Sequence, residues 1–320
     1  MTHPHEGVRA AAERPLPTQV AVLGAGTMGA GIAAVFARAG SHVVLYARRR
    51  STLARARVRI RTVLARLESE PRAREVDARI LTTRSLVRAA RGAELVLESV
   101  VEDLTAKRDL LARAEELAPG ALLATNTSSL RIGDLASALE RPATFAGMHW
   151  FNPPELVDLV EVVPGPETAP ETADALAALA ESLGKVPILV RRDVPGFVAN
   201  RLQYALLREA YALVEAEVVS YEDVDAAVRF GLGPRWAAVG PFESMDLAGL
   251  DVHHEVARRL FPMLANSDAP PARLARLVAE GSLGTKGGRG LRGRYDAAAI
   301  EALETRRTSI LTALSRLERN

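Results

Sequence analysis

Short runs of apolar and β-branched residues alternate with amphipathic Ala/Leu/Arg stretches from residue 19 to about residue 192, and this alternation constrains the fold most strongly. Strands that alternate with helices predict a mostly parallel sheet with helices packed against it. After RRDVPGF the strand pattern stops, and the pattern is helical to the C-terminus. The expected strands lie in QVAVLG, HVVLYA, ELVLESV, ALLATNT, TFAGMHW, LVDLVEVV and VPILVRR.

The composition limits the classes of function. The chain has 320 residues, 48% of them hydrophobic, which is enough for one large or two medium domains. It has no cysteine, which excludes a disulfide framework, a thiolate nucleophile and a cysteine-ligated metal, and we expect no metal site. Acidic and basic residues are interspersed at a net charge of +2, so we expect no nucleic-acid partner. No run reaches the roughly 18 apolar residues of a membrane span, so we expect no membrane partner and a cytoplasmic location.

The first expected strand runs directly into GAGTMGAG, which places Gly24, Gly26 and Gly29 in a G-x-G-x-x-G pattern. An Ala-rich helical pattern and a second strand follow, as a dinucleotide-binding unit requires. In such a loop the second glycine lets the backbone approach a pyrophosphate, which the helix N-terminus attracts. We therefore expect NAD or NADP here, with Thr27 and Met28 also near the cofactor. The alternative is a tight turn without a ligand.

These patterns together predict an α/β chain with three parts. Residues 1–17 are polar and interrupted by proline, which predicts a disordered leader and not a signal peptide. Residues 18–193 are expected to form a Rossmann-type, mostly parallel sheet domain that binds NAD(P). Residues 194–320 are expected to form an all-α domain.

The end of the second expected strand reads VVLYARRR. In an NAD-specific domain an acidic residue normally takes the ribose hydroxyls at this point, and here Ala47 and Arg48 stand there. The missing carboxylate removes a repulsion, and guanidinium groups suit a 2′-phosphate, which favours NADP over NAD. The alternative is a solvated face in an Arg-rich chain.

The motifs GAGTMG, NTSSL, HWFNPP, LVEVV, VPGFVANR, GPFE and GTKGGRG follow one another over nearly the whole chain after the leader. Together they resemble the motifs of the 3-hydroxyacyl-CoA dehydrogenase family. The resemblance implies an NAD(P)-dependent oxidoreductase of fatty acid metabolism that acts on a small-molecule substrate. It also implies a homodimer in which the C-terminal domain forms most of the interface.

The resemblance implies roles for individual residues. His149, in HWFNP, matches the family's catalytic base, and Glu161, in LVEV, matches the glutamate paired with it. Ser128, in NTSS, and Asn200, in PGFVAN, match the residues that bind the substrate oxygen.

Three more residues match positions at the cofactor, and they are Glu102, Lys107 and Asn126. Nearly every cation of the chain is an arginine, so the three lysines are informative. Lys107 lies in the cofactor motif, whereas Lys185 and Lys286 are expected to be structural. An ammonium and a guanidinium group are not interchangeable, which supports a specific contact for Lys107.

The residue types support the same chemistry without the resemblance. Oxidation of a secondary alcohol needs a base for the hydroxyl proton, and an imidazole suits that role. A carboxylate on the other ring nitrogen fixes the tautomer and stabilises the imidazolium. Glu161 shares a strand face with apolar residues, where an unpaired carboxylate would be costly, so we expect it to contact His149. Ser128 as a helix N-cap and Asn200 as the opening of the next segment are the structural alternatives.

Two substrate classes remain open. The segment GLGPRW places Arg235 after a Gly-Pro turn, as in the family branch of L-gulonate 3-dehydrogenase, λ-crystallin and carnitine dehydrogenase. A guanidinium there suits the carboxylate of a short free 3-hydroxy acid. Other motifs resemble acyl-CoA members, and the arginines of the helix expected after the second strand suit a CoA phosphate or an acidic carrier protein. We expect a 3-hydroxyacyl thioester; a non-catalytic cofactor-binding or structural protein is the alternative from another class.

Overall fold

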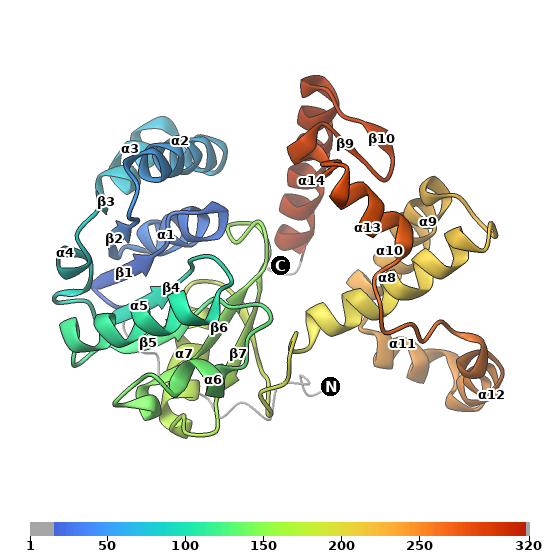
Figure 1. Ribbon diagram of the computed structural model, residues 1–320, viewed down its shortest axis with the longest axis horizontal. Coiled ribbons are helices and arrows are strands. Elements are labelled where there is room, and N and C mark those ends of the chain that lie inside the picture. Colours follow the sequence, from blue (N-terminus) through green and yellow to red (C-terminus); the bar gives the residue numbers. More distant parts are fainter. Residues whose placement is uncertain (1–15, 318–320) are drawn as a thin grey trace. The chain divides into compact units, whose positions relative to one another are not determined.

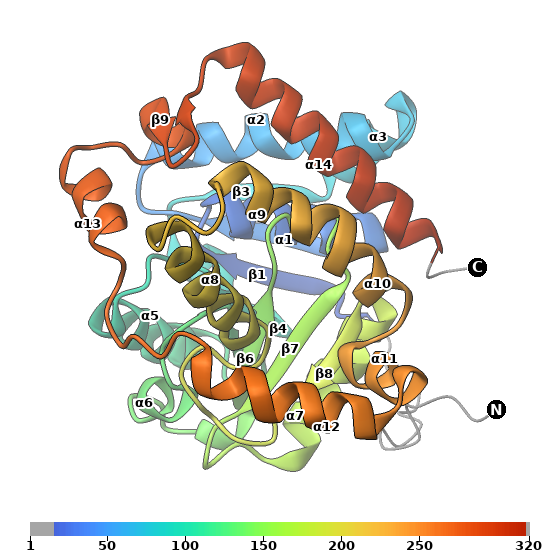
Figure 2. The same cartoon turned by 90° about the vertical axis from the view of Figure 1, so that its right-hand side faces the viewer.

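The computed structural model describes residues 16–317, and it divides into two compact units, Met1–Asn200 and Arg201–Asn320. Figures 1 and 2 show the elements of both units in two orientations. The expected leader, residues 1–17, lies outside the described residues except for Leu16 and Pro17. No helix among residues 16–317 is long and apolar enough to cross a membrane.

The first unit alternates strands and helices along the chain. Its strands are β1 (Gln19–Leu23), β2 (His42–Tyr46), β3 (Ile80–Thr83), β4 (Leu95–Glu98), β5 (Leu122–Thr125), β6 (Phe145–Trp150), β7 (Leu159–Pro164) and β8 (Val186–Leu189). Its helices are α1 (Thr27–Ala39), α2 (Arg50–Leu67), α3 (Glu70–Ala78), α4 (Leu86–Ala90), α5 (Leu104–Leu117), α6 (Ile132–Ala136), the short 3₁₀ turn η1 (Pro142–Thr144) and α7 (Pro170–Ser182).

The eight strands form one sheet in the order β3-β2-β1-β4-β5-β6-β7-β8. Every neighbouring pair is parallel except β6 and β7, which are antiparallel. This confirms the predicted Rossmann-type, mostly parallel sheet. Figure 2 shows β6, β7 and β8 side by side.

One strand of the first unit was not predicted from the sequence. The segment ILTT forms β3, which pairs in parallel with β2 at the edge of the sheet. It has only four residues, and its middle positions Leu81 and Thr82 are not fully buried. The segment carries few apolar residues, and it follows α3 almost directly. It therefore does not stand out from the helical pattern before it.

Helices cover both faces of the sheet, and each face has its own apolar core. Residues of α1, α2 and α7 pack with one face, whereas residues of α4, α5 and α6 pack with the other. The central strand β1 is therefore buried on both faces, and Val20, Ala21, Val22 and Leu23 are all fully buried. This explains why its sequence is continuously apolar instead of alternating.

The second unit is helical, which confirms the predicted second part of the fold. Its helices are α8 (Ala199–Glu215, which begins within the first unit), α9 (Tyr221–Ala227), η2 (Val228–Leu232), α10 (Gly233–Ala238), α11 (Pro241–Ala248), α12 (Leu250–Leu260), η3 (Phe261–Met263), α13 (Ala272–Ala279), η4 (Thr285–Gly287) and α14 (Ala297–Leu317). The exception to an all-α unit is one antiparallel pair of two-residue strands, β9 (Arg289–Gly290) and β10 (Gly293–Arg294).

Candidate active site

The glycine loop lies between β1 and α1, and its three glycines have different surroundings. Gly24 has a φ of +121°, and a Cβ there would lie 2.3 Å from the carbonyl oxygen of Ser99. A Cβ on Gly29 would lie 1.8 Å from the carbonyl oxygen of Gly24. The fold itself therefore requires both of these glycines.

Gly26 is different, because nothing lies within 4 Å of the position that a Cβ would take. Its φ is −75°, which any residue can adopt, and the residue is exposed. It caps α1 without a side-chain hydrogen bond, so the first N–H groups of the helix are open to an anion. The open space at Gly26, beside exposed Thr27 and half-buried Met28, fits the pyrophosphate of a dinucleotide.

A Gly26→Ala variant separates ligand binding from folding. We expect it to keep the Tm of the wild type, because the added methyl group meets no protein atom. The same methyl group would occupy the space proposed for the pyrophosphate, so the affinity for NADH should fall at least about tenfold. Differential scanning fluorimetry and a fluorescence titration with NADH measure the two effects. The matched control Gly29→Ala should lower the Tm strongly. Wild-type NADH affinity in Gly26→Ala would contradict this assignment.

The C-terminal end of β2 carries the residues expected at the cofactor ribose. Ala47 is buried, and its N–H donates to the carbonyl oxygen of Thr83. Arg48, Arg49 and Arg50 are exposed, and the carbonyl oxygen of Arg48 accepts a hydrogen bond of 3.1 Å from the guanidinium of Arg84. This end of the strand thus presents arginine side chains to solvent and holds no carboxylate over residues 47–50.

His149 and Glu161 meet across the antiparallel pair β6–β7. They are direct partners in the register, so their side chains leave the same face of the sheet. His149 Nδ1 lies 2.7 Å from Glu161 Oε2, which is the contact that we expected from the sequence. The other oxygen of Glu161 accepts the N–H groups of Val198 and Ala199, both at 2.9 Å. Glu161 is fully buried, and 5% of His149 is exposed.

The environment of Glu161 favours its ionised form. Burial raises the pKa of this carboxyl. The hydrogen bonds from His149 and from the N–H groups of Ala199 and Val198 lower the pKa by more than burial raises it, so the net shift is downward. A carboxylate at Oε2 requires a proton on Nδ1 of the ring, which leaves Nε2 of a neutral His149 as an acceptor. The pair is therefore arranged to take a proton at Nε2.

Two aromatic side chains fix the plane of the imidazole. Phe151 lies edge-on to it at 4.5 Å between ring centroids, and Phe197 lies at 5.6 Å. Phe197 has a φ of 48°, which is unfavourable for a bulky residue, and it is 1% exposed. This turn aims the N–H groups of Val198 and Ala199 at Glu161. The role of these aromatic residues was not predicted from the sequence, although both lie in motifs that it shows.

A glycine of α1 makes room for the loop after β6. A Cβ on Gly31 would lie 2.5 Å from Cγ of Pro154 and 2.8 Å from Oε2 of Glu155. Pro154 belongs to the NPP turn that connects His149 to the strand of Glu161. The last glycine of GAGTMGAG therefore lets this turn pack against the helix of the glycine loop.

Ser128 and Asn200 lie together in the first unit. The side-chain amide of Asn200 donates to the carbonyl oxygen of Ser128 at 3.3 Å. Ser128 does not cap a helix, because α6 begins at Ile132 and its N-cap is Arg131. The N-cap alternative for Ser128 is therefore wrong, and its hydroxyl has no structural role of that kind.

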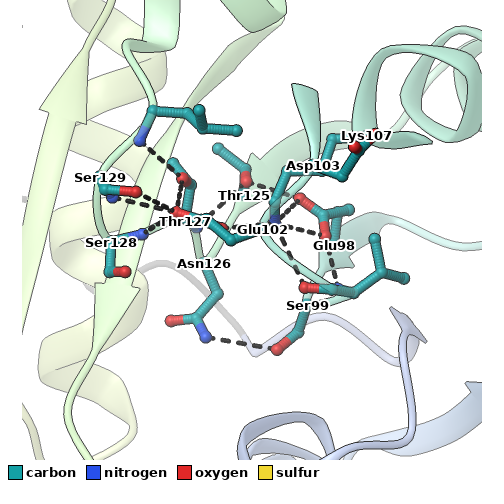
Figure 3. A network of polar contacts seen from close by, with 12 residues as sticks. Glu98, Ser99, Glu102, Asp103, Lys107, Thr125, Asn126, Thr127, Ser128 and Ser129 are labelled. Carbon is teal, nitrogen blue, oxygen red and sulfur yellow. Dashed lines mark hydrogen bonds and ion pairs between the residues drawn. The ribbon is translucent and has the colours of Figure 1, made fainter. Parts of the chain in front are cut away.

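The turn that carries Ser128 is held by Glu102 (Figure 3). Glu102 Oε1 accepts hydrogen bonds from the Thr127 hydroxyl, from both the N–H and the hydroxyl of Ser129, and from the Ser128 N–H. Burial raises the pKa of Glu102, but the bond from Thr127, the charge of Lys107 and the remaining donors outweigh it and lower the pKa to about 2. Glu102 is therefore ionised at neutral pH.

Asn126 ties three strand ends together. Its amide nitrogen donates to the Ser99 hydroxyl at 3.2 Å, and its oxygen accepts the N–H of Trp150 at 2.8 Å. Asn126 thus joins the ends of β4, β5 and β6, at the edge of the sheet where the glycine loop also lies. In open parallel sheets this carboxyl edge is where ligands bind.

Lys107 is buried in the first unit and does not lie on its surface. It is 1% exposed, and its ammonium lies 2.8 and 2.9 Å from the two carboxylate oxygens of Glu98, which is also fully buried. Glu98 was not predicted as a functional residue. The signal in the sequence was a lone acidic residue that ends the apolar strand LVLE.

The other cations singled out in the sequence lie outside this cluster. The ammonium of Lys185 donates to the carbonyl oxygen of Val157 at 2.8 Å, which fits a structural role. Lys286 lies in η4 and Arg235 lies exposed in α10, and both belong to the second unit. A substrate contact for Arg235 stays a prediction.

The fold and this cluster define a class of nicotinamide-dependent dehydrogenase, and comparison with known proteins gives its family. Residues 19–194 match the model of the 3-hydroxyacyl-CoA dehydrogenase NAD binding domain, and residues 196–293 match that of its C-terminal domain. The chain belongs to the 3-hydroxyacyl-CoA dehydrogenase family, which confirms the resemblance seen in the motifs. It is an oxidoreductase that acts on a CH–OH group, and it contains the NAD binding domain of this family.

Relatives with two kinds of substrate are similar to the chain. It is 37% identical to the 5-formyl-3-hydroxy-2-methylpyridine 4-carboxylate 5-dehydrogenase of Mesorhizobium japonicum, over 93% of this chain and 97% of the relative. It is 35% identical to human mitochondrial hydroxyacyl-coenzyme A dehydrogenase, over 88% and 92% of the two chains. A crystal structure of the former kind of enzyme, described as an NAD+ dependent dismutase, gives a TM-score of 0.87 at 35% identity, over 94% and 98% of the two chains.

The crystal structure of (S)-3-hydroxybutyryl-CoA dehydrogenase from Ralstonia eutropha gives a TM-score of 0.70 at 32% identity, over 88% of this chain and 100% of that one.

Proposed function

We propose that the chain interconverts a 3-hydroxyacyl thioester and its 3-keto form, with His149 as general base and acid. The observation that carries this proposal is the 2.7 Å contact between His149 Nδ1 and buried Glu161, which leaves Nε2 to exchange a proton with substrate. The family supports the reaction class, because both matching domain models are those of 3-hydroxyacyl-CoA dehydrogenase.

Each residue of the site has its own role in the proposed reaction. Nε2 of His149 takes the hydroxyl proton of the substrate, and Glu161 stabilises the imidazolium that forms. The glycine loop would hold the nicotinamide cofactor, which would supply the acceptor for the hydride of the alcohol carbon. The Ser128 hydroxyl and the Asn200 amide are proposed to donate hydrogen bonds to the substrate oxygen, which stabilise negative charge on it in either direction. In reduction the imidazolium returns the proton to that oxygen.

For the cofactor, we infer a preference for NADP. The support is the arginine-rich end of β2, where buried Ala47 and exposed Arg48 stand in place of a carboxylate. An Ala47→Asp variant is expected to raise the Kd of NADPH at least about tenfold, because its carboxylate repels a 2′-phosphate. Its Kd for NADH should fall or stay unchanged. A wild-type Kd for NADPH no lower than that for NADH would contradict the inference.

A dehydrogenase of a short free acid is the second candidate function. It is favoured by the TM-score of 0.87 with a pyridine 4-carboxylate 5-dehydrogenase and by an exposed arginine, Arg235, in GLGPRW. In this alternative Arg235 would hold the free carboxylate of the substrate in a bidentate pair. The chemistry at His149 and Glu161 would stay the same.

One spectrophotometric screen distinguishes the two substrate classes. Acetoacetyl-CoA, free 3-keto acids and aromatic carboxylates that bear an aldehyde are offered with NADH and with NADPH, and absorbance at the reduced-nicotinamide band is followed. The proposed function predicts the highest kcat/KM for the thioester. The second candidate would be favoured if only free acids were turned over and if an Arg235→Ala variant turned them over more slowly. No turnover of any of them would favour a non-catalytic cofactor-binding protein.

We also propose a homodimer formed through the second unit. Among the described residues of this unit, 201–317, none is buried within the single chain. Large apolar side chains remain exposed, and Phe242, Leu247 and Phe230 are 79%, 78% and 73% exposed. Such surface is unusual for a monomer and is typical of an obligate interface. Analytical ultracentrifugation should give twice the mass of the chain, and a monomer at micromolar concentration would contradict the proposal.

A further inference from the structure

The linker of residues 190–198 leads from β8 to α8, and its last residue supplies part of the site. The N–H group of Val198 and that of Ala199, the first residue of α8, both donate to Oε1 of Glu161. These two bonds leave the other oxygen of the carboxylate, Oε2, for the ring of His149. The conformation of the linker therefore decides how the carboxylate that orients His149 is held.

The linker ends in a turn with two positive φ angles. Gly196 has a φ of 77°, and Phe197 has a φ of 48°, which is unfavourable for a residue with a bulky side chain. Such a conformation persists only where the surrounding structure holds it. The ring of Phe197 is buried, which fixes the side chain. The backbone on each side of the turn must be fixed as well, because relaxation of the turn would move the N–H groups of Val198 and Ala199 away from Glu161.

Asp193 fixes the linker before this turn. Its Oδ2 accepts the N–H of Gly133 at 2.9 Å, across 60 positions of the chain. Gly133 lies in the first turn of α6, whose N-cap residue Arg131 makes no side-chain capping bond. The N–H groups at the start of a helix need an acceptor, and Asp193 supplies one from the linker. The other oxygen of Asp193, Oδ1, is buried and has no hydrogen-bond partner among residues 16–317, so no other donor there competes with Gly133.

A second hydrogen bond joins the same two segments. The turn of Ser128 leads into α6, and the side-chain amide of Asn200 donates to the carbonyl oxygen of Ser128 at 3.3 Å. Segments 128–133 and 193–200 are therefore joined at both ends, by Asp193 at one end and by Asn200 at the other. The two N–H donors to Glu161 lie between these ends. Without the bond of Asp193, the strained turn would be fixed on its C-terminal side only.

We propose that Asp193 is a positioning residue, which acts through the linker to hold the N–H groups of Val198 and Ala199 on Glu161. By this route Asp193 keeps the imidazole of His149 oriented for proton transfer. Its effect passes through the backbone, because its hydrogen bond goes to Gly133 and not to the pair of His149 and Glu161. The inference rests on the proposed function only for the consequence that kcat depends on His149.

The variant Asp193→Ala removes this contact. Asp193 is only partly buried, and its truncation leaves the Gly133 N–H without its acceptor, so we expect a folded protein with a modestly lower Tm. Hydrogen–deuterium exchange measures the linker without substrate or cofactor. The amides of residues 197–199 should exchange at least about tenfold faster than in the wild type, because the turn is free to relax.

The kinetic and binding constants of Asp193→Ala should change unequally. Its kcat should fall at least about tenfold, because Glu161 no longer orients the imidazole of His149 as closely. The Kd of NADH should stay within about twofold of the wild type, because the linker is not part of the glycine loop. The conservative variant Asp193→Asn keeps an oxygen acceptor for the Gly133 N–H, so its kcat and its exchange over residues 197–199 should recover to within about threefold of the wild type.

The matched control is Glu94→Ala. The carboxylate of Glu94 also joins two distant segments, because its Oε1 accepts the N–H of Thr18 at 3.0 Å. Thr18 directly precedes β1, and Glu94 directly precedes β4, so this bond lies at the amino ends of two parallel strands, away from the site. Glu94→Ala should leave kcat and the exchange of residues 197–199 unchanged. The control shows whether loss of any such bond in the first unit lowers kcat.

The outcomes separate the inference from the proposed function. Faster exchange of residues 197–199 in Asp193→Ala, with a wild-type Kd for NADH and recovery in Asp193→Asn, supports the inference. Wild-type exchange in Asp193→Ala overturns it, and so does an equal loss of kcat in Asp193→Ala and Glu94→Ala. Lack of turnover by the wild type would overturn the proposed function alone, because exchange and NADH affinity are measured without the hydroxy substrate.

Discussion

A His149→Asn variant is expected to lose about 10³-fold in kcat, because the asparagine amide cannot take a proton at the position of Nε2. The Kd of NADH should stay close to the wild-type value, since His149 is assigned to the substrate and not to the cofactor. The Tm should fall only modestly, because the asparagine amide can still donate a hydrogen bond towards Glu161. Initial rates of reduced-nicotinamide formation and a fluorescence titration give the two comparisons.

The matched control for this variant is His42→Gln. His42 is exposed at the start of β2, so its imidazole is not part of the cluster at Glu161. Its replacement should leave kcat unchanged. If His149→Asn retained more than about a tenth of wild-type kcat, His149 would not be the general base.

A Glu161→Gln variant is expected to lose both activity and stability. The amide nitrogen of glutamine would face either the Nδ1–H of His149 or the N–H groups of Val198 and Ala199. In either orientation one N–H donor would point at another N–H donor. We expect kcat to fall about 10² to 10³-fold through the wrong imidazole tautomer. The free energy of unfolding should fall by about 2 kcal/mol, because a charged acceptor of buried donors is lost.

The pH dependence of unfolding gives an independent check on Glu161. The pKa of Glu161 is lowered in the folded state, so its carboxylate stabilises the fold fully above the ordinary carboxyl pKa. That stabilisation is lost as the pH falls through the folded pKa. The difference in free energy of unfolding between wild type and Glu161→Gln should therefore shrink towards acidic pH, as urea denaturation measures. A difference that stays constant from neutral to acidic pH would contradict the assignment of an ionised Glu161.

The strands and the pair at the site were predictable because short local patterns determine them. The apolar runs of β1 and β4 stand out since both faces of the sheet are covered. The NPP turn between two such runs predicts that His149 and Glu161 meet on neighbouring strands, and the antiparallel register places them opposite each other. In contrast, β3 is a short edge strand, and edge strands carry a weaker apolar pattern.

The supporting residues of the site were not predictable in the same way. Glu98 looks like a misplaced charge in the sequence, and only the fold brings Lys107 and Thr125 to it. Similarly, the left-handed φ of Phe197 depends on the packing of its ring beside His149. Sequence motifs indicate which residues meet the ligand, whereas long-range hydrogen bonds decide which residues hold them in place.

The central claim is that His149 and Glu161 serve the oxidation of a 3-hydroxy group by hydride transfer. The most direct measurement follows deuterium from C3 of a 3-hydroxybutyryl thioester into the reduced nicotinamide by mass spectrometry. The account predicts one deuterium on the reduced cofactor with the wild type and none above background with His149→Asn. Reduced cofactor without deuterium, or equal deuterium transfer by both proteins, would contradict it.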